Sequence, residues 1–213
     1  MRQKSMLLPA LLGALLLLSS SAHAVSFTLA QLNSGTSFDS GDGTLTFSDF
    51  HVTKTKKLSG DLSLYTVTVL PDGFSLSSSE FNATSGGLRK LDLTYKVTAK
   101  SGVITGAGVD MVASLTSGRV KVEKDIEDSD SASDLGTFLI TLLTGSRSIL
   151  SDSDTFPPGA LSFDVSEEVR IKKVSSLTSV SNSYTTVPEP ATLSLLSLGL
   201  GGLAWIGRRR QSA

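Results

Sequence analysis

The densest run of chemistry-bearing side chains is acidic and lies between residues 123 and 134. Asp128 and Asp130 alternate as the carboxylates of calcium-binding loops do, and Asp134 follows them. The run departs from the EF-hand pattern, because Ala132 stands at the third ligand position, no glycine follows and no glutamate closes the loop. Two interpretations stay open, a calcium site on these three aspartates and a solvated loop between strands, and we favour the loop.

Other catalytic patterns are absent from the sequence. His51 is the one histidine after residue 24, and a lone imidazole predicts an ordinary strand position. No serine lies in a Gly-x-Ser-x-Gly motif, and the lack of cysteine excludes thiol catalysis and thiolate metal sites. Paired carboxylates could serve a glycosidase, but residues 25–187 contain no tryptophan to form a sugar-binding platform. We therefore expect a protein that is not an enzyme and has no cofactor, with calcium as the one candidate.

Three consecutive features occupy residues 187–213. Two prolines flank Glu189, fix φ and hold the chain extended. An uncharged run over residues 191–207 would span about 25 Å as a helix, near the short limit for a bilayer. A basic tail at 208–210 favours the cytoplasmic side, which leaves the preceding chain outside that membrane. The residues of the proline motif and the tail are Pro188, Glu189 and Pro190, and Arg208, Arg209 and Arg210.

In this order and spacing, the three features resemble the PEP-CTERM sorting signal of exported proteins from Gram-negative bacteria that make extracellular polysaccharide. The resemblance implies recognition by exosortase, an integral-membrane protease/transpeptidase, at the Pro-Glu-Pro motif, with the arginines as the stop-transfer element. It also implies an intermediate anchored in the inner membrane and a final place at the cell surface or outside the cell. The resemblance covers only this tail and implies no activity for the remainder of the chain.

The N-terminus has the features of a secretory signal peptide over residues 1–24. Arg2 and Lys4 form a positive region, and an apolar region follows over residues 7–18. Ala22 and Ala24 form an A-x-A cleavage site, so we expect cleavage after Ala24. The apolar region is too short to span a membrane well. We therefore expect export through the secretion machinery.

The remaining body, residues 25–187, is long enough for one domain with a sizeable core. It carries 14 Lys and Arg against 19 Asp and Glu, a formal charge of −5, which argues against nucleic acid as a partner. An exported domain without cysteine has no disulfides, so its stability must come from its hydrophobic core.

The body has the alternating pattern of short strands separated by turn residues. The clearest strand is 91–99, and we expect a first strand through Phe27 and Leu29, a bulge at Asp49 and a central strand at 138–143. Eight or nine such strands without a long amphipathic helix predict an antiparallel β-sandwich, with a jelly roll or barrel as the alternative. The sandwich is expected over residues 25–174, followed by a Ser/Thr-rich linker at 175–186 and the sorting signal at 187–213.

These features leave three hypotheses for the body. The first is a structural or adhesive protein of the cell surface or extracellular matrix. The second is a calcium- or carbohydrate-binding module of the exopolysaccharide matrix, and the third is a secreted hydrolase. The sequence favours the first.

Overall fold

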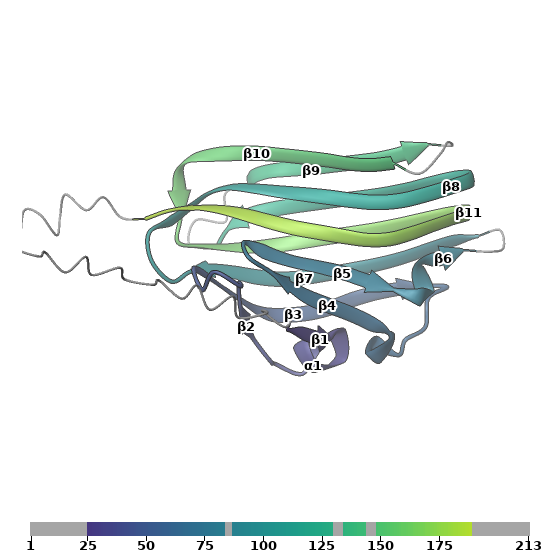
Figure 1. Ribbon diagram of the computed structural model, residues 1–213, viewed down its shortest axis with the longest axis horizontal. Helices are drawn as coiled ribbons and strands as arrows, with labels where there is room; N and C mark the ends of the chain where they lie inside the picture. Colours follow the sequence, from purple (N-terminus) through teal and green to yellow (C-terminus); the bar gives the residue numbers. More distant parts are fainter. Residues whose placement is uncertain (1–24, 84–86, 130–133, 144–147, 189–213) are drawn as a thin grey trace, which may run out of the picture.

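The computed structural model describes residues 25–83, 87–129, 134–143 and 148–188 of the 213-residue chain (Figure 1). All strand pairings in this part of the chain are antiparallel, which confirms the predicted all-β class. The strands are β1 (Ser26–Thr28), β2 (Phe38–Asp39), β3 (Leu45–Lys56), β4 (Tyr65–Leu70), β5 (Gly73–Ser78), β6 (Asn82–Ala83), β7 (Leu88–Ala99), β8 (Val103–Asp128), β9 (Asp134–Leu143), β10 (Ser148–Ala160) and β11 (Ser162–Val187). The helical elements are α1 (Leu29–Asn33) and the 3-10 turns η1 (Leu62–Leu64) and η2 (Ser79–Phe81).

The predicted signal peptide at 1–24 and the predicted membrane helix at 191–207 lie outside the described residues. Within those residues, no helix is both long enough and apolar enough to cross a membrane.

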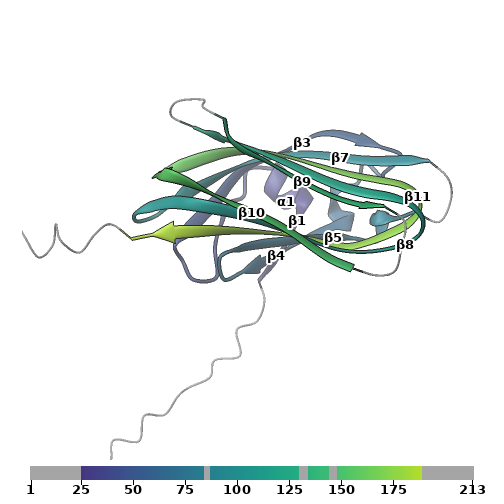
Figure 2. The ribbon, with the colours of Figure 1, turned by 90° about the horizontal axis from the view of Figure 1, so that it is seen from above.

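Two long strands, β8 and β11, hold the body together. Each has 26 residues, and they pair with one another over nearly their whole length. The pair bends near its middle, so that its two halves lie in facing layers (Figure 2). The first layer contains β2, β3, β7, β9 and residues 162–172 of β11 with 117–128 of β8; the second contains β1, β4, β5, β10 and residues 180–187 of β11 with 103–112 of β8. The architecture is thus a sandwich folded from one continuous hydrogen-bonded sheet.

Backbone irregularities mark the place where the pair bends. Gly118 of β8 has a φ of 128°, and a Cβ atom there would lie 2.0 Å from the carbonyl oxygen of Lys172. Only glycine fits so close an approach. On β11, Lys173 has a φ of 66°, and the register against β8 shifts on either side of residues 175–177.

The linker predicted at residues 175–186 is wrong, because this segment is the second half of β11. It pairs with β8 along one edge and with β5 along part of the other. Leu177, Val180 and Tyr184 are buried in the core. The bulge after Leu177 moves the next buried position to Val180, so the apolar residues do not keep a period of two. The folded body therefore extends to Val187.

Aromatic rings from both layers fill the space between them. The ring centroid of Phe74 on β5 lies 5.4 Å from that of Phe47 on β3 and 5.1 Å from that of Tyr95 on β7. Phe50 joins this cluster at 5.7 Å from Phe74. It can do so because Asp49, with a φ of 56°, forms a bulge that turns the next residue inward. The predicted bulge at Asp49 is confirmed.

Two local predictions are wrong. The first strand ends at Thr28, before Leu29, because Thr28 and Gln31 form a capping box that starts α1. Residues 138–143, predicted as a central strand, belong to β9, which pairs with β8 alone among the described strands. Apolar density does not by itself tell how many neighbours a strand has.

Candidate functional site

The proline motif follows directly on the last strand of the body. β11 ends at Val187, whose register partner is Val103 of β8, at the left edge of the body in Figure 1. Pro188 comes next and is exposed. A proline has no backbone N–H and cannot extend the hydrogen-bonded ladder, so the strand stops here. The motif therefore begins with no spacer between it and the folded body.

The remaining predicted site residues are only partly described. Of the calcium candidates, Asp128 ends β8 and Asp134 begins β9. No group of three side chains that could hold a metal ion forms among the described residues. His51 lies on β3, the ordinary strand position that was predicted for it, and its side chain is exposed. The predicted residues outside the described part of the chain are Ala22, Ala24, Asp130, Glu189, Pro190, Arg208, Arg209 and Arg210.

A pocket of about 250 Å³ opens on the outer face of the first layer. The hydroxyl-bearing residues Thr94 and Ser166 line it beside four carboxylates from β3, β8 and β11. The one aromatic residue in its lining, Tyr95, is itself buried. The pocket is thus acidic and offers no exposed ring on which a sugar could stack. Its carboxylates are those of Asp49, Asp125, Glu127 and Asp164.

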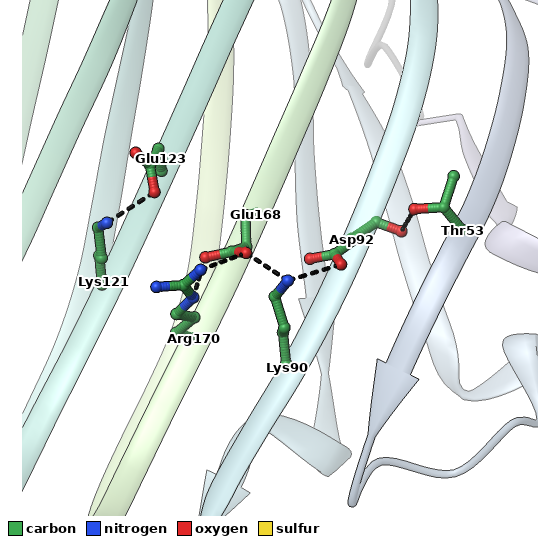
Figure 3. Close-up of polar contacts among 7 residues, drawn as sticks. All are labelled: Thr53, Lys90, Asp92, Lys121, Glu123, Glu168 and Arg170. Atoms are coloured by element: carbon green, nitrogen blue, oxygen red, sulfur yellow. Dashed lines mark hydrogen bonds and ion pairs between the residues drawn. The ribbon is translucent and has the colours of Figure 1, made fainter.

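Two rows of opposite charge cross the outer face of the first layer (Figure 3). Glu168 lies at the centre of the acidic row and forms ion pairs with Lys90 and Arg170. Partial burial would raise the pKa of the Glu168 carboxyl, but hydrogen bonds from these two cations and their charge hold that pKa below its ordinary value. From β7 through β11 to β8, the acidic row is Asp92, Glu168 and Glu123, and the basic row is Lys90, Arg170 and Lys121.

A second polar cluster, which we call the interlayer cluster, is sealed between the two layers. It consists of Lys124, Glu167, Tyr95, Asn182 and Tyr184, none of them more than 3% exposed. Lys124 and Glu167 are register partners on β8 and β11 in the first layer. Asn182 and Tyr184 come from the second half of β11, in the second layer. The cluster therefore joins the layers through polar groups.

Hydrogen bonds connect most members of the interlayer cluster. The Tyr95 hydroxyl donates to Oε2 of Glu167 over 3.3 Å and lies 2.9 Å from the Tyr184 hydroxyl. Nζ of Lys124 donates to the Gly108 carbonyl over 3.3 Å and lies 4.3 Å from the centroid of the Tyr184 ring. One lysine thus contacts the opposite layer through both a carbonyl and an aromatic face.

Burial determines the charge states in the interlayer cluster. It lowers the pKa of Lys124 to about 7, against the opposing effect of the Glu167 charge. It raises the pKa of the Glu167 carboxyl, against the effects of Lys124, Asn182 and Tyr95. Desolvation therefore favours a neutral amine beside a protonated acid.

The interlayer cluster was not predicted from the sequence, although the sequence carries a signal for it. Lys124 falls in phase with the inward-facing Val122 and Ile126, and Glu167 falls in phase with Val165 and Val169. A charged residue at the apolar phase of a strand faces the core. Two such residues on different strands indicate a buried charge pair.

Comparison with known protein families identifies a motif in the C-terminal tail. Residues 186–211 match the PEP-CTERM protein-sorting motif. The sequence has no significant match among curated proteins.

Several solved structures resemble the body weakly. TmCBM61 in complex with β-1,4-galactotriose is 13% identical, with 66% of this chain and 90% of that chain covered and a TM-score of 0.39. TmCBM27, a carbohydrate-binding module that recognises mannan, is 7% identical over 63% of this chain and 85% of that one, with a TM-score of 0.35. The enzymatically active domain of bacteriophage CBA120 tailspike protein 4 is 13% identical over 69% and 20%, with a TM-score of 0.31. Likeness at these scores does not identify a shared fold, so the architecture rests on the strand pairing described above.

The tail match agrees with the resemblance in the sequence and with the place where β11 ends. The chain is therefore a protein that contains a PEP-CTERM protein-sorting motif, attached directly to an antiparallel β-sandwich.

Proposed function

We propose that the protein is an exported structural or adhesive β-sandwich, without enzymatic activity, which exosortase recognises at Pro188, Glu189 and Pro190. The secretion machinery delivers the body, the C-terminal helix holds it at the inner membrane, and processing passes it to the cell surface or the extracellular matrix. The sorting motif at residues 186–211 is the observation that supports the export and exosortase part of this proposal.

The fold restricts where processing can act. Residues up to Val187 pair with β8. A protease binds its substrate as an extended peptide, and a paired strand cannot bind in this way without leaving the sheet. Pro188 is the first residue beyond the ladder. The cut therefore falls after Val187, and the released body keeps all of β11.

Intact-mass measurement of the protein from host cells with and without exosortase tests this proposal. We expect loss of residues 1–24 in both strains, and loss of the tail beyond the Pro-Glu-Pro motif only where exosortase is present. A mass that retains Arg208, Arg209 and Arg210 in both strains would refute processing and indicate an ordinary membrane anchor.

A further inference from the structure

The interlayer cluster contains the three functional groups that an amide-forming reaction needs. Lys124 supplies an amine, Asn182 a carboxamide and Glu167 a carboxyl group, and all three side chains are buried. Their strands hold them in fixed positions between the layers. Polar side chains of this kind are seldom buried together unless hydrogen bonds satisfy them, so their arrangement calls for a physical reason.

The amine and the carboxamide meet across the sandwich. Lys124 lies in the first layer, but its Nζ reaches the second layer, where it donates to the Gly108 carbonyl. Gly108 is adjacent in sequence to Val109, the register partner of Asn182. The Tyr184 ring, 4.3 Å from the same Nζ, belongs to the second residue after Asn182 and is buried with it. The lysine is therefore aimed at the segment of β11 that carries Asn182.

Glu167 lies next to both partners. It is the register partner of Lys124, and its charge acts on that amine. The Asn182 amide lies close enough to lower the pKa of the Glu167 carboxyl against the effect of burial. Neither Oδ1 nor Nδ2 of Asn182 completes a hydrogen bond of normal geometry, although both are buried. A buried carboxamide in this state is disfavoured, and conversion into another group would relieve it.

We propose that Lys124 and Asn182 are joined by an isopeptide bond between Nζ and Cγ, and that Glu167 transfers the protons of the reaction that forms it.

The reaction is balanced without any added reagent. The neutral Nζ attacks Cγ of Asn182, and the C–N bond of the new amide forms. The Glu167 carboxyl gives its proton to the carboxamide and accepts one from Nζ, so it ends in the state in which it began. The bond between Cγ and Nδ2 breaks, and ammonia leaves. The folded body brings amine and carboxamide together, which replaces a bimolecular encounter by a reaction within one molecule.

The electrostatics of the interlayer cluster suit each role. Burial lowers the pKa of Lys124 to about 7, so that a large share of the amine is neutral and nucleophilic at neutral pH. Burial also raises the pKa of Glu167, which keeps a proton available for the leaving group. The sealed interior excludes water, which would compete with the amine and hydrolyse the product.

The bond would connect the two layers covalently through their longest strands. Lys124 belongs to the half of β8 in the first layer, and Asn182 to the half of β11 in the second. The chain contains no cysteine, so no disulfide can serve this purpose in an exported protein. β11 also leads directly into the sorting motif, so the bond would fasten the segment through which the body is attached. The chemistry itself does not depend on the sorting function.

Peptide mass spectrometry of the mature protein, purified from its host, tests the proposal. An isopeptide-bonded Lys124 resists trypsin, so digestion should yield peptide 122–147 joined to the peptide that begins at Val174, with a combined mass lower by one ammonia. Recovery of the two peptides unlinked, with cleavage after Lys124, would overturn the proposal. A link from Lys124 to peptide 148–170, with loss of one water, would also overturn it, because it would identify Glu167 as the acceptor.

Variants separate the roles of the three residues. Lys124→Arg and Asn182→Ala should each abolish the linked peptide, whereas Lys121→Arg on the same strand should preserve it. Asn182→Asp should form the link with loss of water in place of ammonia. Glu167→Gln should greatly reduce the linked fraction, and a fully linked Glu167→Gln protein would refute the proton-transfer role. The assay on the unmutated protein remains decisive if any variant fails to fold.

Discussion

Ending the chain after Val174 should unfold the body, whereas ending it after Pro188 should leave it folded. Residues 175–187 contribute Leu177, Val180 and Tyr184 to the core, at 1%, 0% and 3% exposure. Burial of a large apolar side chain stabilises the folded state by about 1.5–3 kcal/mol, so their removal costs roughly 5–9 kcal/mol. A domain of this size is stable by about 5–15 kcal/mol in total. The truncation also leaves β8 and β5 with an unpaired edge.

The assay compares residues 25–174 with residues 25–188 by circular dichroism during heating and in urea. We expect one cooperative transition for 25–188 and none for 25–174. A matched pair of substitutions within 25–188 controls for chain length. Leu177→Asp puts a charge in the core and should destabilise strongly, whereas Thr178→Asp, at the exposed neighbouring position, should have little effect.

Cooperative unfolding of 25–174 at the midpoint of 25–188 would refute this reasoning. The Ser/Thr-rich segment would then be the linker that its composition suggests, and β11 would end near the bend. Equal effects of Leu177→Asp and Thr178→Asp would point the same way, because a linker buries neither side chain.

Three further changes follow from local contacts. Phe74→Ala, at the centre of the aromatic cluster, should lower the free energy of unfolding by about 3–5 kcal/mol in urea titration, and a loss well under that of a large core cavity would contradict the packing described. Because the folded-state pKa of Glu168 lies below its ordinary value of 4.5, its stabilising effect is present above that pH and is lost as the pH falls through the folded-state pKa. Glu168→Gln should therefore reduce the fall in melting temperature as the pH drops below 4.5. An unchanged fall would show that the ion pairs of Glu168 do not stabilise the fold. Thr28→Ala should cost about 1 kcal/mol by removing the cap of α1, whereas Thr28→Ser should be nearly neutral in the same titration.

Local patterns predicted much of this fold. The alternation at 91–99 became β7, and the bulge at Asp49 turned Phe50 into the core. The way in which β8 and β11 join the two layers could not be predicted from such local patterns. Gly118 is an ordinary turn residue in the sequence, but in the structure it lies within one strand at a bend. Whether a glycine ends a strand or bends it depends on pairing with β11, which is distant in sequence.

The two candidate sites differ in the same way, since one is contiguous in sequence and the other is assembled by the fold. The sorting motif was predictable because it is contiguous and needs no folded partner for recognition. The interlayer cluster was not predicted, because its members lie on β7, β8 and β11, which are distant in sequence. Lys124 and Glu167 become a pair only once β8 and β11 are in register, and Asn182 joins them only once that strand pair has bent. A search for charged residues at inward positions on two strands would have found the first two.

The place of β11 in the sheet bears on how an attached body would resist force. It pairs with β8 up to Val187, so a pull applied at Pro188 along the strand axis would act on that pairing. Hydrogen bonds between antiparallel strands are perpendicular to that axis, so such a pull loads many of them together, where a pull on an edge hairpin would open them one after another. The apolar residues Leu177, Val180 and Tyr184 resist the same sliding motion, because each would have to leave its place in the core. A strand that stays paired with β8 up to its last residue is therefore a strong point of attachment for a sorting signal, and a spacer would not improve it.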